Sequence, residues 1–83
     1  MIDGVCVAWD DDEGWGVLRS ADAESDVFAH FSELRIAGFA RLAAGEAVRF
    51  EIEPYPHGQD GFFFRAANVT PREPAGDSAG RGL

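Results

Sequence analysis

The chain has 83 residues, of which 46% are apolar, and these values fit a single small globular domain. The net charge is −8 and the seven basic residues are all arginines, so no basic field covers the whole surface, and a nucleic acid would have to be bound locally. The single cysteine excludes an internal disulfide. The sequence shows no signal peptide and no run of about eighteen apolar residues, and we therefore expect a cytoplasmic protein without a membrane segment.

Short apolar runs separated by turn residues predict an all-β chain, because no window has the length and period of a sizeable helix. Five strands are expected, at residues 2–9, 14–20, 27–31, 45–53 and 62–69. The connections are an acidic turn at 10–14, a polar turn at 21–25, one helical turn capped by Ser32, an irregular stretch over 35–44, and a loop that follows Pro54. Five strands with a long third connection favour a small antiparallel Greek-key barrel over a sandwich.

The domain boundary is expected near residue 71. Residues 1–71 hold the five predicted strands and are expected to form the barrel. Residues 72–83 are rich in Gly, Ala, Pro and charged side chains, and cannot bury enough apolar surface to offset the entropy of ordering the chain. We therefore expect a disordered C-terminal tail.

Two segments carry the candidate function: Gly14-Trp15-Gly16-Val17-Leu18 and Val27-Phe28-Ala29-His30-Phe31. Because side chains alternate along a strand, Trp15 shares a face with Val17, and Phe28 shares one with His30. If the two strands are neighbours, these side chains form one exposed panel. The glycines on either side of Trp15 would then let a flat ligand approach its indole. A nucleobase is such a ligand, since stacking on an aromatic ring contributes about 1–3 kcal/mol whatever the base.

Other segments complete a family pattern: Asp26 to Ser32, Gly38-Phe39, Gly45 to Phe50, and Ala67 to Thr70. Together with the two aromatic segments, in this order and spacing, they resemble a cold-shock domain over residues 4–70, about four-fifths of the chain. The resemblance implies a five-stranded OB-fold barrel that binds single-stranded RNA or DNA. It also implies a stacking surface made of Trp15, Phe28, His30 and Phe39, with Phe31 beneath or beside them and Trp9 contributing an edge.

The sequence departs from the family pattern in ways that weaken this surface. Ala8 and Val17 stand where the family has aromatic residues, and Val7 and Glu13 stand where it has lysines. The stretch from His57 to Arg65 is also longer than is usual in the family. Fewer positive charges release fewer counterions from a nucleic acid, so we expect weaker binding with a flatter salt dependence.

Several residues allow more than one interpretation. The aromatic panel could instead pack within the barrel or form a self-contact. Of the three phenylalanines at 62–64, alternation sends at least one outside the core, where a hydrophobic cluster with Tyr55 is favoured over ligand contact. Arg65 and Arg49 are candidates for phosphate contacts, but salt bridges to Glu51 or Glu53 explain them equally well.

The remaining motifs give no separate chemistry. The run Asp10-Asp11-Asp12-Glu13 lacks the distant ligand of a calcium loop and is expected to be a solvated turn. Cys6 lies in an apolar run and is expected in the core, and Asn68-Val69-Thr70 is expected to end the last strand rather than to carry a glycan. No catalytic spacing of Ser, Cys, His or acidic residues and no phosphate loop is present, so we expect no enzyme, no metal and no cofactor.

Two functional hypotheses follow. The first is a module that stacks the bases of single-stranded RNA or DNA on its aromatic panel with little sequence specificity, and that melts weak RNA hairpins as a chaperone. The second is a diverged barrel that contacts a protein partner, or forms a homodimer, through the same aromatic surface or through residues 62–64.

Overall fold

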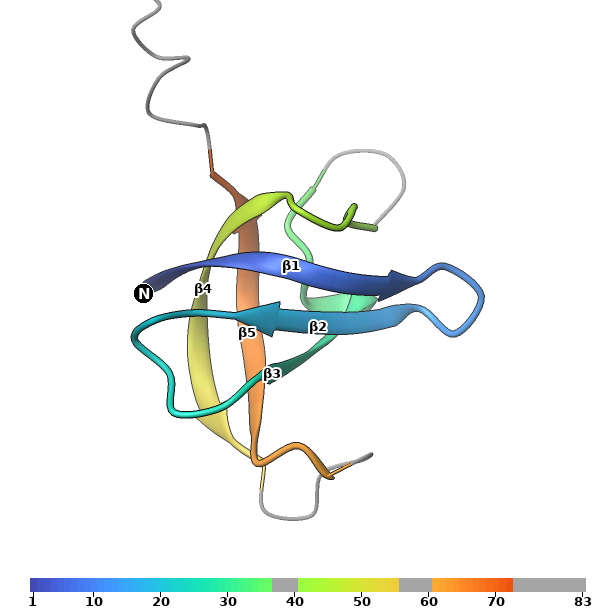
Figure 1. Cartoon of the computed structure of the whole chain (residues 1–83). Helices are drawn as coiled ribbons and strands as arrows, with labels where there is room; N and C mark the ends of the chain where they lie inside the picture. The colour runs from blue at the N-terminus through green and yellow to red at the C-terminus, as the bar shows by residue number, and fades with distance from the viewer. Residues whose placement is uncertain (37–40, 56–60, 73–83) are drawn as a thin grey trace, which may run out of the picture.

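The computed structural model describes residues 1–36, 41–55 and 61–72, in which the chain forms a closed five-stranded barrel (Figure 1). The elements in chain order are β1 (Ile2–Asp10), β2 (Trp15–Arg19), β3 (Val27–His30), the short 3-10 helix η1 (Phe31–Glu33), β4 (Ala47–Pro54) and β5 (Phe64–Pro71). The all-β class and the five-stranded barrel predicted from the sequence are confirmed. Phe39 and the tail expected to be disordered beyond residue 72 lie outside the described residues.

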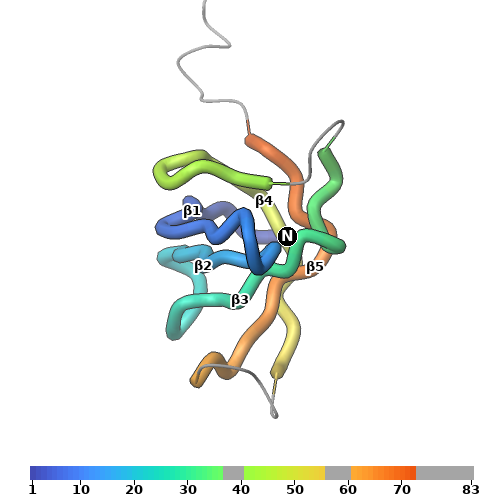
Figure 2. The backbone as a smooth tube through the Cα atoms, turned by 90° about the vertical axis from the view of Figure 1, so that its right-hand side faces the viewer, coloured from blue at the N-terminus to red at the C-terminus, as the bar shows by residue number. Residues whose placement is uncertain are grey.

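The strands are hydrogen-bonded in the order β1-β2-β3-β5-β4, and β4 pairs back onto β1 to close the barrel. Figure 1 shows β1 and β2 crossing β4 and β5 at a steep angle, and the side view in Figure 2 places β1, β2 and β3 one below another. Four of the pairings are antiparallel, as expected, but β3 meets β5 in parallel, with Phe28 opposite Arg65. This parallel contact brings Arg65, from the last strand, beside the aromatic residues of β3.

The barrel interior is filled by apolar side chains from all five strands. Its largest fully buried side chains are Phe50, Leu18, Val27, Val48, Val69 and Cys6. Cys6 is a free thiol in this core, as the apolar run around it predicted. Because alternate residues of β2 and β3 face this core, the residues between them face outward and are available for a surface site.

A β-bulge in β1 changes which residues face the core. Cys6 pairs with Leu18 and Ala8 pairs with Val17, so Val7 is an extra residue on the β1 side of the ladder. After the bulge the alternation is reversed, because one inserted residue moves every following side chain to the other face. Ala8 is therefore exposed, and Trp9 turns toward the inside of the barrel.

The acidic run after β1 forms a tight turn, as expected. The Asp10 side chain accepts hydrogen bonds from the backbone N–H groups of Asp12 and Glu13 at 2.9 and 3.0 Å. The backbone carbonyl of Asp10 also accepts from the N–H of Gly14, at 2.8 Å. These bonds fix the geometry with which the chain enters β2 at Trp15.

Candidate nucleic-acid interface

Trp15 and Phe28 form the centre of an aromatic cluster on the outer face of β2 and β3. The two strands pair with Trp15 opposite His30 and Val17 opposite Phe28, so the four side chains predicted to share a face do so. The rings of Trp15 and Phe28 are stacked, with centroids 5.2 Å apart and planes inclined by 28°. Trp15 is half-buried, so part of its indole remains at the surface.

Phe28 is not the exposed ring that the sequence predicted, since its exposed fraction is only 5%. It is surrounded by Trp15 and by two rings from the β4–β5 region, Tyr55 at 5.5 Å and Phe62 at 6.0 Å between centroids. Phe62 also makes an edge-to-face contact with Trp15, with ring centroids 6.0 Å apart. The hydrophobic cluster expected for residues 62–64 therefore forms, and Phe62 and Tyr55 extend the aromatic surface. Their place on Phe28 depends on the β3–β5 contact, which strand alternation alone does not reveal.

His30 and Phe31 form a second aromatic pair where β3 ends. Their ring centroids are 4.6 Å apart, and 46% of the Phe31 surface is exposed. The cap of η1 is His30 rather than the expected Ser32, because the His30 Nδ1 accepts a hydrogen bond from the backbone N–H of Ser32 at 3.2 Å. With Nδ1 acting as the acceptor, the neutral imidazole carries its proton on Nε2. His30 is thus held in one orientation, with its hydrogen-bond donor at Nε2.

The two glycines beside Trp15 are required by packing, which corrects the expectation that they admit a ligand. A Cβ at Gly16 would overlap the Trp9 ring and the carbonyl oxygen of Ala8. A Cβ at Gly14 would lie 2.9 Å from the Phe31 ring, and Gly14 has a positive φ of 78° that other residues rarely adopt. The glycines therefore let Trp9 and Phe31 approach the backbone on either side of Trp15.

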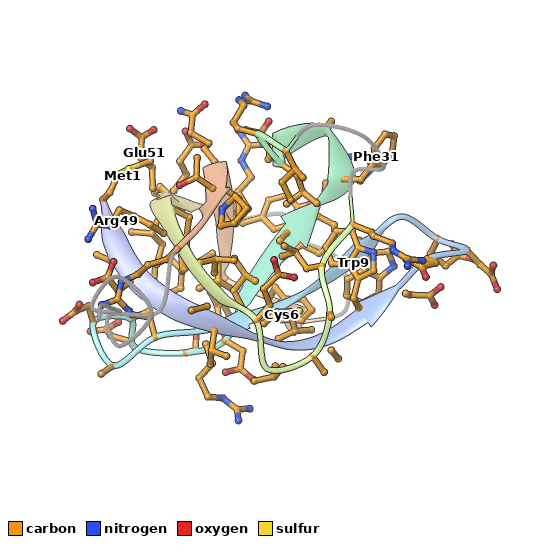
Figure 3. All side chains as sticks on the ribbon, turned by 90° about the horizontal axis from the view of Figure 1, so that it is seen from above. Met1, Cys6, Trp9, Phe31, Arg49 and Glu51 are labelled. Atoms are coloured by element: carbon orange, nitrogen blue, oxygen red, sulfur yellow. The ribbon has the colours of Figure 1, made fainter. Side chains whose placement is uncertain are left out.

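Trp9 does not lie on the panel, although the resemblance implied that it contributes an edge there. It pairs with Gly16, one residue out of phase with Trp15, and packs against the barrel core. The cause is the bulge in β1, which turns Trp9 inward. Figure 3 shows Trp9 and Phe31 toward the end of the barrel that carries the β1–β2 turn, with Arg49 and Glu51 toward the opposite end.

A hollow of about 220 Å³ adjoins the aromatic cluster. Its walls are the apolar surfaces of Phe28, Tyr55 and Ala66 and the polar side chains of His30, Ser32, Glu33 and Arg65. It is smaller than the roughly 300–1,000 Å³ of pockets that take drug-sized ligands, so its size suits one flat group. Arg65 contributes to this hollow while its guanidinium lies 5.8 Å from the Tyr55 ring centroid.

Residues 2–71 match the model of the family described as "'Cold-shock' DNA-binding domain". The chain belongs to the cold-shock domain family. It is 43% identical over 65 residues to cold shock-like protein CspC of Escherichia coli K12, a match that covers 77% of this chain and 87% of that protein. It is 40% identical over 77 residues to glycine-rich protein 2 of Nicotiana sylvestris, which covers 92% of this chain but only 34% of the plant protein.

The solved structures show the same fold. The Drosophila Unr CSD456 structure matches with a TM-score of 0.68 and 20% identity, over 89% of this chain and 27% of that chain. In the described part of this cold-shock domain, no helix has the length and hydropathy to cross a membrane. The same residues contain no group of three or more His, Cys, Asp or Glu side chains arranged to hold a metal ion.

Every arginine that the structure describes in this cold-shock domain has a carboxylate partner within 4 Å. The pairs are Arg19–Asp26, Arg35–Glu33, Arg41–Asp11, Arg49–Asp3, Arg65–Glu53 and Arg72–Asp3. Arg65 thus takes the salt bridge to Glu53 that the sequence allowed, at 3.0 Å, whereas Arg49 pairs with Asp3 instead. A phosphate must therefore compete with a carboxylate for each of these cations.

Two of these pairs change the ionisation of their acids. The hydrogen bond from Arg19 lowers the pKa of Asp26 below its ordinary value, and the hydrogen bond from Arg49 lowers the pKa of Asp3 in the same way. Arg19 binds Asp26 through two hydrogen bonds of 2.9 Å, one to each carboxylate oxygen. These bidentate contacts fix the polar turn that leads into β3.

Proposed function

We propose that this cold-shock domain binds single-stranded RNA or DNA by stacking bases on Trp15, on the His30–Phe31 pair and on Phe39. Phe39 itself lies outside the described residues. The observation that supports it most directly is the half-exposed Trp15 on the outer face, stacked on Phe28 and one strand away from His30. Stacking tolerates any base, because every base has a π-face. Over most of this stacking surface, the domain would therefore bind single strands with little sequence preference.

Phe28 has a supporting role in this proposal. At 5% exposure it cannot meet a base while Trp15, Tyr55 and Phe62 surround it, but it supports the Trp15 indole from below. A rigid aromatic platform loses little conformational entropy when a base stacks on it. Trp15 is thus held in place by its contact with Phe28 before a ligand arrives.

The charges predict weak binding. All the described arginines are paired with carboxylates, and the net charge of −8 repels a polyanion at long range. Few counterions would be released on binding, so we expect affinity to come mainly from stacking and to change little with salt. A weak, salt-insensitive binder of this kind suits transient contact with open strands, and we extend the proposal to the melting of weak RNA hairpins in the cytoplasm.

Tryptophan fluorescence tests the proposal. Titration with oligothymidine or oligouridine at low salt is expected to quench the emission of Trp15, while Trp9 stays packed against the barrel core. With a fluorescently labelled strand as the reporter, Trp15→Leu should abolish binding, and Trp15→Phe should retain it because it keeps an aromatic face. Absence of binding by the wild type at tens of micromolar would contradict the proposal, and a concentration-dependent dimer in analytical ultracentrifugation would then favour the protein-contact hypothesis.

A further inference from the structure

Glu33 is an acidic residue at the hollow beside the aromatic cluster. It belongs to η1 and lines the hollow together with Phe28, His30 and Arg65. A carboxylate in a surface that binds nucleic acid is unfavourable toward phosphate. It is, however, a strong acceptor for the N–H groups of a base edge.

The position of this carboxylate is fixed by its neighbours. Its Oε1 accepts a hydrogen bond from the backbone N–H of Asn68 at 3.2 Å, and Arg35 lies 3.6 Å from the same oxygen. Asn68 has a φ of 51°, in the left-handed region, at a bulge of β5. This conformation frees its N–H from the strand ladder for Glu33. No described residue forms a hydrogen bond with Oε2.

The bases differ in what they offer such an acceptor. Guanine presents two adjacent donors, N1–H and the N2 amino group, which match the two oxygens of a carboxylate. Thymine and uracil present one N–H between two carbonyl oxygens, which a carboxylate repels. Adenine and cytosine present an amino group beside an unprotonated ring nitrogen, so they offer one donor and one repulsive contact.

We propose that Glu33 makes this hollow a guanine-selective subsite within an otherwise unselective stacking surface. The inference rests on the proposed function and adds a base preference to it. The other polar residues of the hollow agree with guanine, because its O6 and N7 accept hydrogen bonds and both His30 and Arg65 carry N–H donors. Tyr55 and Ala66 supply apolar surface for the ring.

The test compares short oligothymidines that differ only at one central nucleotide. The strand with a central guanine is expected to bind about tenfold more tightly than the strand with a central thymine, as a good bidentate contact discriminates between bases by about 1–3 kcal/mol. A central inosine, which lacks the N2 amino group, should lose most of this preference. Binding of all strands with equal affinity would overturn the subsite and leave the proposed function intact, whereas binding of none would overturn both.

Glu33→Gln identifies the residue responsible. The amide oxygen can still accept from Asn68, so the fold is preserved, but the adjacent NH₂ group faces a donor of guanine and the preference should fall to about twofold or less. Glu51→Gln is the matched control, because Glu51 also bonds Asn68, at 2.8 Å, but does not line the hollow. A guanine preference that survives in Glu33→Gln, or is lost equally in Glu51→Gln, would overturn the role of Glu33.

Discussion

Replacing Gly16 with alanine separates two explanations of the Gly14-Trp15-Gly16 segment. If the glycine serves to admit a ligand, the variant folds normally and only binding suffers. In the structure, however, a Cβ at this position overlaps the Trp9 ring and the carbonyl oxygen of Ala8. The oxygen belongs to the backbone of β1, so no side-chain rotation removes the overlap, and the pairing of β1 with β2 must loosen.

The expected loss of stability is about 2 kcal/mol. Overpacking an interior position costs about 1–3 kcal/mol, and contact with backbone atoms places Gly16→Ala toward the upper end. The change from glycine to alanine also restricts the unfolded chain, which offsets about 0.4–1 kcal/mol of the loss. For a domain of this size a loss of 1 kcal/mol lowers the melting temperature by about 4–8 °C, so the variant should melt about 8–16 °C lower.

Urea unfolding followed by circular dichroism measures this change, with Gly45→Ala as the control. Gly45 has a positive φ of 92°, but a Cβ there meets nothing within 4 Å, so its cost is backbone strain of roughly 1 kcal/mol. Gly16→Ala should therefore be the less stable of the two variants. A Gly16→Ala protein that is as stable as the wild type and fails to bind oligonucleotide would refute the packing explanation.

Three further predictions concern acid stability and binding. The ion pair with Arg19 stabilises the fold only while Asp26 is ionised, so this stabilisation should be lost as the pH falls through about 3.8 and then through the lower pKa of folded Asp26. In urea titrations, Asp26→Asn should flatten the dependence of the unfolding free energy on pH. An unchanged pH profile would contradict this role of Asp26. Phe62→Ala should weaken oligothymidine binding about two- to tenfold, because it removes a ring of the aromatic surface that contacts Trp15 with an energy of about 0.5–1.5 kcal/mol; tighter binding by fluorescence titration would instead show that Phe62 covers the platform. Glu53→Gln should release Arg65 for phosphate and steepen the slope of log affinity against log salt by about 0.7, and an identical slope would show that Arg65 does not reach the strand.

The strands of the barrel could be predicted from the sequence because their signals are local. Alternation of apolar residues and the turn residues at 10–14 and 21–25 placed each strand within a few residues of its observed bounds. The same alternation also predicted that Trp15, Phe28 and His30 lie on one face of the sheet. The orientation of Trp9 could not be predicted in this way, because a bulge at Val7 reverses the alternation and no residue type in that run marks the bulge.

The parts of the site that the sequence did not predict depend on contacts between distant segments. Phe28 is buried because the β3–β5 contact brings Tyr55 and Phe62 over it. Glu33 acquires a fixed place in the hollow through Asn68, 35 residues away in the chain. Such contacts arise only when the barrel closes, so a pattern read along one strand does not contain them.

The two indole N–H groups give the most direct test of base stacking on this face. In a ¹⁵N-correlated NMR spectrum of the labelled protein, Trp15 and Trp9 each contribute one indole signal, and single-residue variants assign them. On addition of a short single-stranded oligothymidine, the Trp15 signal is expected to move with saturation, while the Trp9 signal, from a ring packed against the core, stays in place. A Trp15 signal that does not move while signals elsewhere shift and saturate would contradict base stacking on Trp15, because the strand would then be bound without this ring.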